Sequence, residues 1–208
     1  MKKIYIVQHC QSEHHINDLT GGSTDTPLTA LGRKQAVAVA KELKSMGLHD
    51  FHLLSSDLTR ATMTAEAIQE AFSQDMTLVK ALREIHNGDA MNQTKQWAQA
   101  HAFYDASVFE LDRPQWRNAE TPRALYQRMK QVIQDYMTTQ TKDLVIVSHG
   151  VAIAYLISAW LGISVEQMKH SFLKGHAGGI SLLAVSPLGQ NTLIHFNQTS
   201  HLKHLMTP

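Results

Sequence analysis

The chain has 208 residues, of which 43% are hydrophobic and 18% charged, and this balance is typical of one globular domain rather than of a disordered or fibrous protein. Its 19 Lys and Arg residues against 18 Asp and Glu leave a formal net charge of +1, which argues against a nucleic-acid or membrane-surface partner. One cysteine excludes an internal disulfide, and the chain start and hydropathy lead us to expect a cytoplasmic protein without a signal peptide or membrane span.

The first part of the chain alternates short apolar runs with segments of helical periodicity. We expect a strand at residues 4–7, a helix at 31–46, a strand at 51–55 and a helix at about 60–72. Gly47 is a plausible stop for the first helix, and Asp57 or Thr59 is expected to cap the second. Strand followed by helix therefore occurs twice.

The second part continues the alternation after a polar interruption. We expect a strand at residues 77–82, a lid-like insertion from 85 to about 120 with helical pieces near 94–103, a helix at 122–137, a strand at 144–147, a helix at 151–161 and a hairpin of strands at 180–185 and 192–196. This order predicts a three-layer α/β/α sandwich around a mostly parallel sheet. With no linker-like stretch and no internal repeat, residues 1–208 are expected to form one domain.

Polar side chains follow four of the expected strands. His9, Arg60, Glu84 and His149 come after the first, second, third and fourth strand respectively. Each alone is more often a hydrogen-bonded structural residue than a catalyst. In open α/β sheets, however, ligands bind beyond the carboxyl ends of the strands, so four such residues at one edge favour a functional site.

These four residue types suit phosphoryl transfer without a metal or other cofactor. A neutral imidazole is a competent nucleophile, and an arginine with a second histidine in its imidazolium form can neutralise the phosphoryl oxygens. A protonated carboxyl group, here Glu84, can hand a proton to the leaving alcohol. Glu84 fills that role at neutral pH only if its pKa is raised.

The ordered motifs resemble those of the histidine phosphatase superfamily, also called phosphoglycerate mutase-like. They are Gln8-His9-Cys10, the block 26–36, the block 55–61 with Thr64-Ala65, Leu82-Arg83-Glu84-Ile85 with Gly88, and Val147-Ser148-His149-Gly150. The resemblance implies a nucleophilic His9 that forms a phosphohistidine, a phosphate clamp of Arg60 and His149, and Glu84 as proton donor. It also implies substrate binding by Ser12, by the backbone of Thr20-Gly21-Gly22 and by Gly150. The family usually has an asparagine six residues after the nucleophile, where this chain has His15, and Asn17 follows two residues later, so either His15 or Asn17 is expected to bind the phosphate.

The sequence departs from the family beside the nucleophile. The family's usual motif reads Arg-His-Gly, where this chain has Gln8, His9 and Cys10. Glutamine keeps a hydrogen-bond donor but loses a charge that would bind the phosphoryl oxygens, so Gln8 is expected to slow catalysis. Charged hydrogen bonds contribute about 1.5–3 kcal/mol, and loss of a transition-state arginine costs about 10³ to 10⁵ in rate in other phosphoryl-transfer enzymes.

Four other functions compete with a phosphohistidine phosphatase. A cysteine phosphatase would need an arginine six residues after Cys10, where the chain has Ile16. A metal hydrolase would need a third ligand for a pair such as His14-His15, and no suitable spacing occurs, so no metal is expected. A phosphate-ester binding protein whose catalysis is lost through Gln8 and a phosphoglycerate mutase are alternatives that the sequence leaves open.

The expected substrate is a phosphorylated small molecule or phosphoprotein. The sequence does not fix the oligomeric state, and a dimer is one possibility.

Overall fold

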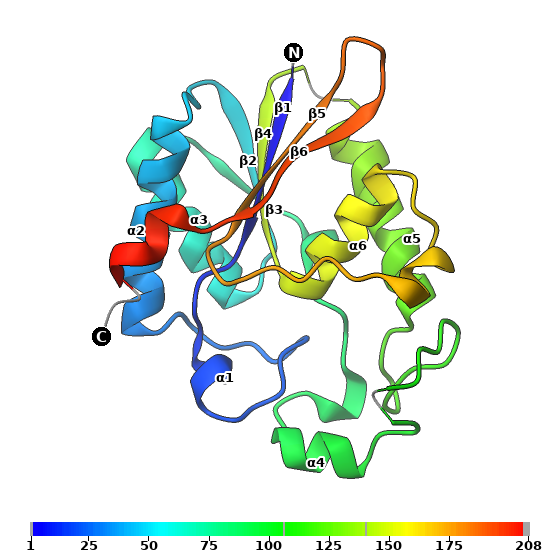
Figure 1. Cartoon of the computed structure of the whole chain (residues 1–208). Coiled ribbons are helices and arrows are strands. Elements are labelled where there is room, and N and C mark those ends of the chain that lie inside the picture. The colour runs from blue at the N-terminus through cyan, green and yellow to red at the C-terminus, as the bar shows by residue number, and fades with distance from the viewer. Residues whose placement is uncertain (1, 106, 140, 206–208) are drawn as a thin grey trace.

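The computed structural model describes residues 2–105, 107–139 and 141–205, and its centre is one six-stranded sheet (Figure 1). The strands lie in the order β3-β2-β4-β1-β5-β6. Their bounds are β1 Lys3–Gln8, β2 Phe51–Ser55, β3 Met76–Leu78, β4 Asp143–Ser148, β5 Ile180–Val185 and β6 Asn191–Gln198. The first four run parallel, and β5 and β6 are antiparallel additions at one edge. The expected mostly parallel sheet with a terminal hairpin is confirmed.

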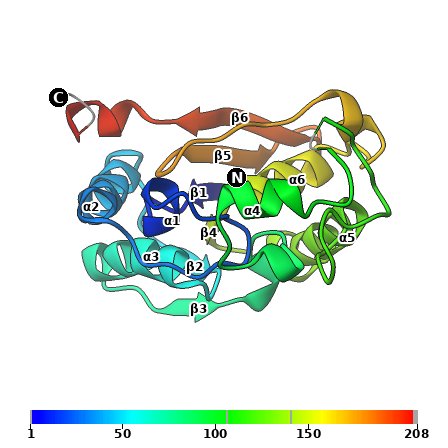
Figure 2. The same cartoon turned by 90° about the horizontal axis from the view of Figure 1, so that it is seen from below.

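Helices cover both faces of the sheet, as the view along it shows (Figure 2). Helices α2 (Ala30–Ser45) and α3 (Thr59–Phe72) lie on one side, and α5 (Pro122–Val132) and α6 (Gly150–Trp160) on the other. Because successive side chains of a strand point to opposite faces, β1 contributes to two cores. Its residues Tyr5 and Val7 pack with α2 and α3, whereas Ile4 and Ile6 pack with α5 and α6. The three-layer α/β/α sandwich is thereby confirmed.

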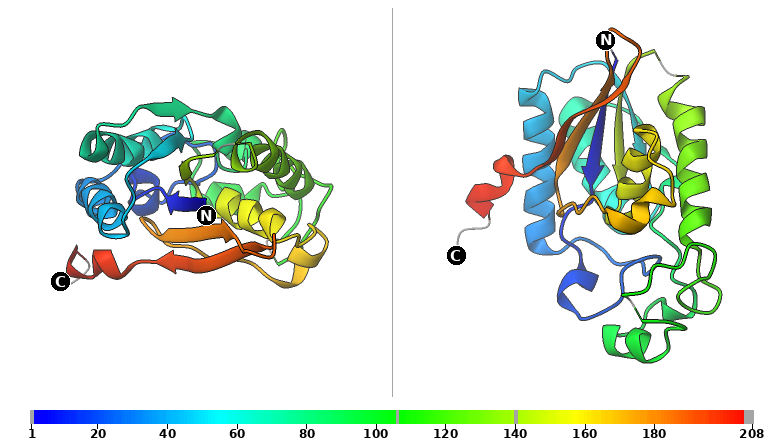
Figure 3. Two further views of the ribbon diagram at one scale, coloured as in Figure 1. Left: turned by 90° about the horizontal axis from the view of Figure 1, so that it is seen from above. Right: turned by 45° about the vertical axis from the view of Figure 1, so that its right-hand side comes forward.

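The strand register brings three carboxyl ends to one level. Val147 of β4 pairs with Val7 of β1 on one side and with Ser55 of β2 on the other. The residues that directly follow these strands therefore emerge together at the same edge. That edge faces the short helices α1 (Glu13–Ile16) and α4 (Lys95–Ala100), which lie beyond the sheet in two views (Figures 1 and 3).

Several expected boundaries shift. The strand expected at 77–82 ends at Leu78, and Lys80–Leu82 form a 3-10 turn that carries the chain inward to the buried Leu82. Helix α5 ends at Val132 and continues as a π turn over Ile133–Met137, not as one α-helix.

The expected cap of α3 is wrong. The helix begins after Leu58, and Asp57 instead forms an ion pair with Arg83. The carboxylate of Asp25 accepts hydrogen bonds from the backbone N–H and the hydroxyl of Thr59, so the cap comes from a distant loop.

Further short turns complete the described chain. They are 3-10 turns at Gly88–Ala90, Gln167–His170 and Ser200–Leu205. Of the helices in the described ranges, none combines the length and apolar character that crossing a membrane requires.

Candidate catalytic site

His9 directly follows β1 and is 3% exposed. Its Nδ1 lies 2.8 Å from the carbonyl oxygen of Cys10, which only accepts, so Nδ1 carries the proton of the neutral ring. The lone pair is therefore on Nε2, toward which the Nε–H of Arg60 points at 3.2 Å. Burial and the positive charge of Arg60 hold the pKa of His9 well below its usual value. The ring is neutral, with a fixed tautomer and its lone pair on Nε2.

Arg60 lies in the first turn of α3 and joins His9 to the loop 20–24. Its guanidinium donates to the carbonyl oxygens of Thr24 at 2.6 Å and Gly22 at 2.7 Å, besides the bond to His9. The side chain is 1% exposed, and burial lowers its pKa to about 10, which leaves it charged at neutral pH. Arg60 therefore places a permanent positive charge beside the His9 electron pair.

His149 follows β4 and is fully buried, with its ring centroid 5.0 Å from that of His9. The hydroxyl of Ser56, which accepts a hydrogen bond from the backbone N–H of Leu58, lies 2.8 Å from Nε2 of His149. When this hydroxyl donates to Nε2, the ring proton of His149 is on Nδ1, which has no hydrogen-bond partner within the described part of the chain. A buried donor left unpaired is costly, and an oxygen of a bound anion would satisfy it.

Glu84 lies at the N-terminus of α6, where its carboxylate accepts three backbone hydrogen bonds. Oε1 accepts from Ile85 at 3.0 Å and Ala152 at 2.8 Å, and Oε2 accepts from Val151 at 2.9 Å. Burial raises the pKa of Glu84 and outweighs the opposing effects of these N–H groups and of Arg60. Oε2, with a single acceptor bond, is the oxygen that has room for a proton.

A cavity of about 270 Å³ brings the expected residues together at the sheet edge. It is lined by Gln8, His9, His15, Gly21, Gly22, Arg60, Glu84 and Gly150, and also by residues that the sequence did not indicate, among them His14, Lys174 and Gly175. Four expected residues lie outside the lining. His149 is one, although its ring lies 5.0 Å from that of His9. The others are Ser12, which is buried and bonds His14, Thr20, which faces a neighbouring pocket, and Asn17, whose amide donates to Glu13.

Of the two candidates for the asparagine position, His15 is the one in the cavity. The backbone N–H of Ser12 donates to its Nδ1 at 3.1 Å, so the neutral ring carries its proton on Nε2. Burial and the charge of Arg60 lower the pKa of His15. His15 is therefore a neutral N–H donor, as one N–H of an asparagine amide would be.

Asn87 fixes the loop that shapes one wall of the cavity. Its side-chain oxygen accepts from the N–H and hydroxyl of Ser23, and its amide nitrogen donates to the hydroxyl of Thr20 and the carbonyl of Gly21. A side chain at Gly22 would collide with Asn87 at 2.7 Å, and the positive φ of 60° at this position also requires glycine. Nothing in the sequence placed Asn87 beside a loop more than sixty residues away.

Cys10 belongs to the hydrophobic core rather than to the cavity. It is fully buried, and burial raises the pKa of its thiol to about 12. A thiol of that pKa is not a nucleophile at neutral pH. The buried thiol therefore does not support a cysteine phosphatase.

The expectation that His14 and His15 lack a third neighbour is wrong. Ring nitrogens of His9, His14 and His15 lie within 4.8 Å of one another because α1 folds back over the end of β1. The nitrogens of His9 already bond Cys10 and Arg60, and the Nδ1 of His15 already accepts from a backbone N–H. The adjacent charge of Arg60 favours an anion over a cation at this position.

The buried histidines predict loss of stability in acid. Burial lowers the pKa of His14 to about 3 and those of His9 and His149 well below 6.5. Below about pH 6.5 the unfolded chain binds protons at these histidines and the folded chain does not. The histidines therefore make their full contribution to the free energy of unfolding above that pH, and this contribution is lost as the pH falls toward their pKa values in the folded chain. Glu84, with its raised pKa, works in the opposite sense but is a single group.

We therefore expect the free energy of unfolding to fall between pH 7 and pH 5, by at most about 1.4 kcal/mol per pH unit for each histidine. Urea unfolding at the two pH values measures it. His14→Gln should flatten the dependence, whereas the exposed His52→Gln should leave it unchanged. Equal stability of the native chain at both pH values would contradict the assignment of neutral buried rings.

Comparison with known proteins identifies a family. The model of the histidine phosphatase superfamily (branch 1) matches residues 4–199. The probable phosphoglycerate mutase GpmB of Proteus mirabilis is 31% identical over 172 residues, which cover 78% of this chain and 76% of that protein. The glucosyl-3-phosphoglycerate phosphatase of Mycolicibacterium vanbaalenii is 30% identical over 192 residues, which cover 88% and 84%.

A solved structure agrees with this assignment. The phosphoserine phosphatase of Entamoeba histolytica, in complex with 3-phosphoglyceric acid, matches with a TM-score of 0.79 and 26% identity. The match covers 97% of this chain and 100% of that one. Shared architecture therefore extends over nearly the whole of both chains.

Proposed function

This chain belongs to the histidine phosphatase superfamily, and from that premise we propose that it hydrolyses phosphomonoesters through a phosphohistidine at His9, without a metal. The observation that carries the proposal is the state of the His9 ring. Its Nδ1 proton is held by the Cys10 carbonyl, and its Nε2 electron pair faces the cavity residue Arg60. The fixed tautomer leaves Nε2 unprotonated for attack, and the adjacent positive charge can stabilise the phosphoryl oxygens.

The reaction divides into two transfers. In the first, Nε2 of His9 forms a bond to phosphorus while the P–O bond to the alcohol breaks, and the protonated Glu84 gives its proton to the leaving oxygen. In the second, water attacks the phosphohistidine, Glu84 takes a proton from that water, and the bond from Nε2 to phosphorus breaks. Inorganic phosphate leaves, and both residues return to their starting states.

Other residues around His9 hold the phosphoryl group. Arg60 turns a donor from Nε2 of His9 to a phosphoryl oxygen as the substrate enters. His149 Nδ1, which has no partner in the described structure, and His15 Nε2 are neutral donors to the same group. Neutral rings stabilise the developing charge by hydrogen bonds alone, so the cationic residues decide how strongly a dianion is bound.

Gln8 is the weak point of this arrangement. Its amide lies between Gly150 and Gly175. A Cβ atom added at Gly150 would stand 3.4 Å from Nε2 of Gln8, and one added at Gly175 would stand 2.5 Å from Oε1 of Gln8. We expect Gln8→Arg to raise kcat/KM roughly tenfold, because a charged hydrogen bond to the phosphoryl group is about 1.5–3 kcal/mol in strength. Steady-state hydrolysis of an aryl phosphate measures the gain.

The control for Gln8→Arg is Gln190→Arg, which adds the same charge in the turn between β5 and β6. It should leave kcat/KM unchanged. A Gln8→Arg variant no faster than the native chain would mean that the missing charge is supplied elsewhere.

Lys174 is the candidate for such compensation. Among the described residues that line the cavity, Lys174 and Arg60 are the only lysine and arginine. Lys174 precedes Gly175, and the following His176 is fixed by two hydrogen bonds to Asn197. The segment is therefore anchored next to Gln8, with a cation at the mouth of the cavity.

We expect Lys174→Met to lower kcat/KM roughly tenfold, mainly through KM, because one of two cations facing the dianion is lost. Lys169→Met, on the neighbouring 3-10 turn, is the matched control and should have no effect. Adding Gln8→Arg to Lys174→Met should restore most of the loss. Unchanged kinetics in Lys174→Met would contradict a role for this cation.

The test of the proposed function is hydrolysis of an aryl phosphate in the presence of a chelator. Metal-independent turnover supports the phosphatase. A binding protein silenced by Gln8 would instead be stabilised by phosphate esters without turning them over. Activity that appears only in Gln8→Arg would therefore overturn the proposal in favour of the binding protein.

A further inference from the structure

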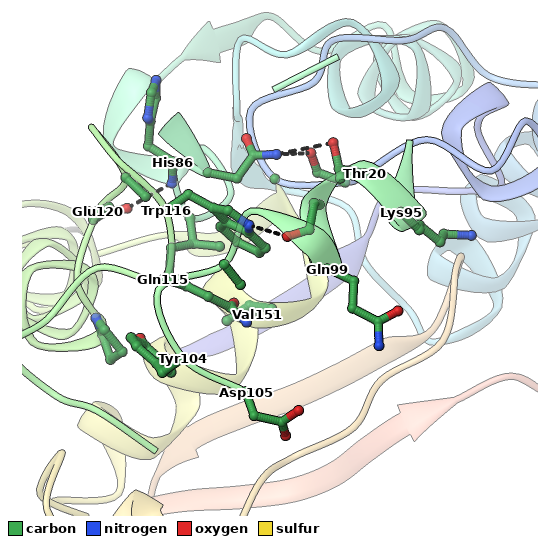
Figure 4. Close-up of a pocket in the computed structure, with 18 residues that line it drawn as sticks. Thr20, His86, Lys95, Gln99, Tyr104, Asp105, Gln115, Trp116, Glu120 and Val151 are labelled. Atoms are coloured by element: carbon green, nitrogen blue, oxygen red, sulfur yellow. Dashed lines mark hydrogen bonds between the residues drawn. The ribbon is translucent and has the colours of Figure 1, made fainter. Parts of the chain in front are cut away.

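A second pocket, of about 610 Å³, opens beside the catalytic cavity (Figure 4). The two share Gly21, Gly22, Ile85 and Val151, so a phosphoryl group held at His9 would direct its ester oxygen toward this space. The outer wall comes from the segment between Ile85 and Pro122, which includes α4. The pocket is therefore placed to take the alcohol portion of the substrate.

Two aromatic rings form the wall that faces this space. The Nε1 of Trp116 donates to the carbonyl oxygen of Ala98 at 2.7 Å, and the hydroxyl of Tyr104 donates to the carbonyl oxygen of Arg113 at 2.9 Å. The polar ends of both side chains are thus engaged with backbone, and both rings contribute apolar surface. Alanine, proline and valine side chains supply much of the remaining lining: Ala98, Ala102, Ala119, Pro122 and Val151.

The charges around the pocket do not suit an anionic alcohol. Among the described lining residues, Lys95 is the only lysine or arginine, and its ammonium lies 3.5 Å from the carboxylate of Asp18. Asp105 and Glu120 both contribute carboxylates to the lining, and that of Glu120 forms an ion pair with Arg128 at 2.7 Å. A substrate carboxylate would meet the like charge of Asp105 and one lining cation that already has a partner, which disfavours its binding.

Building on the phosphatase function proposed above, we infer that the alcohol portion of the substrate is uncharged and aromatic or heteroaromatic, of the size of one or two fused rings. Pockets of this volume take ligands of that size and larger. Stacking against Trp116 and Tyr104 supplies affinity, and the carboxylate of Asp105 selects against acids. The inference separates this chain from enzymes that act on phosphorylated sugar acids.

A matched pair of substrates tests the charge selection. The phosphate esters of methyl 3-hydroxybenzoate and of 3-hydroxybenzoic acid differ by one charge and have similar leaving groups. We expect kcat/KM to be on the order of tenfold higher for the methyl ester. Asp105→Asn should narrow that ratio, and 3-phosphoglycerate should be turned over more slowly than either. An acid hydrolysed as well as its ester would overturn the inference.

Variants of the ring wall test the stacking. With 1-naphthyl phosphate, Trp116→Ala should raise KM roughly tenfold, and Trp116→Phe, which keeps a ring, should retain most of the affinity. Trp97→Ala is the matched control, because Trp97 lies on the same segment but stacks on His101 outside the pocket lining. Equal KM values in Trp116→Ala and Trp97→Ala would contradict the assignment.

Binding to His9→Ala separates this inference from the proposed function. If the native chain turns over none of these esters, the phosphatase function fails, and the same compounds are titrated calorimetrically into His9→Ala. Tighter binding of the methyl ester than of the acid would still support an uncharged aromatic ligand. Equal binding, tighter binding of the acid, or no binding of either would overturn the inference.

Discussion

His9→Ala is expected to lower kcat for aryl phosphate hydrolysis by about 10⁴-fold or more, since removal of a covalent nucleophile leaves only binding and electrostatic stabilisation. The ring nitrogen that would attack, Nε2, carries no proton and lies 3.2 Å from Nε of the charged Arg60. Initial rates at saturating substrate measure the loss. Thermal melting at pH 7 shows whether the variant folds.

The neighbouring histidines provide the control for this variant. The rings of His14 and His15 lie 5.9 Å and 5.5 Å from that of His9, near enough to be alternative nucleophiles. In our account His15 is only a donor to the phosphoryl group, so His15→Ala should weaken substrate binding and retain turnover. A His9→Ala variant that keeps a tenth of the native rate, or a His15→Ala variant that loses all of it, would contradict the assignment of the nucleophile.

Glu84→Gln is expected to lower the rate by about 10² to 10⁴ for alkyl phosphates, whose alcohols need a proton in order to leave. The effect on phosphoenzyme formation from 4-nitrophenyl phosphate should be much smaller, because 4-nitrophenolate leaves without one. A residue that only supports the structure would affect both substrates equally. The ratio of the two effects is therefore the measurement, made by single-turnover kinetics.

The pH dependence gives Glu84 a second readout. Burial raises the pKa of its carboxyl group, and the acid form is the proton donor, so alkyl phosphate hydrolysis should fall as the pH rises through that raised pKa. Burial also lowers the pKa of His9, so the nucleophile stays neutral well below pH 6.5. Activity is therefore expected on the acid side of neutrality. In Glu84→Gln the fall of activity with rising pH should disappear from the pH–rate profile. A Glu84→Gln variant that still shows this fall would contradict the assignment of Glu84 as proton donor.

The sequence was most informative where chemistry and topology coincide. His9, Arg60, Glu84 and His149 each follow an expected strand, and the carboxyl ends of parallel strands necessarily meet at one edge. Their convergence therefore followed from the alternation of strands and helices, before any distance was known. The register of β4 against β1 and β2 explains why His9 and His149 are neighbours although 140 positions separate them.

What the sequence did not indicate are contacts between loops. Asn87 fixes the loop at Gly22, Asp25 caps α3, and the hydroxyl of Ser56 forms a hydrogen bond with Nε2 of His149. None of these pairs follows from periodicity, because loop positions depend on the tertiary fold rather than on local propensity. The same applies to Lys174, which precedes Gly175 and lies far along the chain from the motif beside the nucleophile.

The early end of β3 has a comparable cause. The apolar run that begins at Met76 continues to Leu82 and has the composition of a strand. After Leu78 the chain turns inward. Ser148, the last residue of β4, then donates a hydrogen bond from its hydroxyl to the carbonyl oxygen of Leu82. Burial of Leu82 and placement of Glu84 near α6 thus outweigh the local preference for an extended strand.

The most direct test of the phosphohistidine is to trap it. Native chain mixed with an aryl phosphate labelled with ³²P and quenched in alkali should carry up to one phosphoryl group per molecule, stable to base and labile to acid, and peptide mapping should place it on His9. His9→Ala should carry none. Turnover by the native chain without any such label, or a label on His14 or His15, would contradict the central claim.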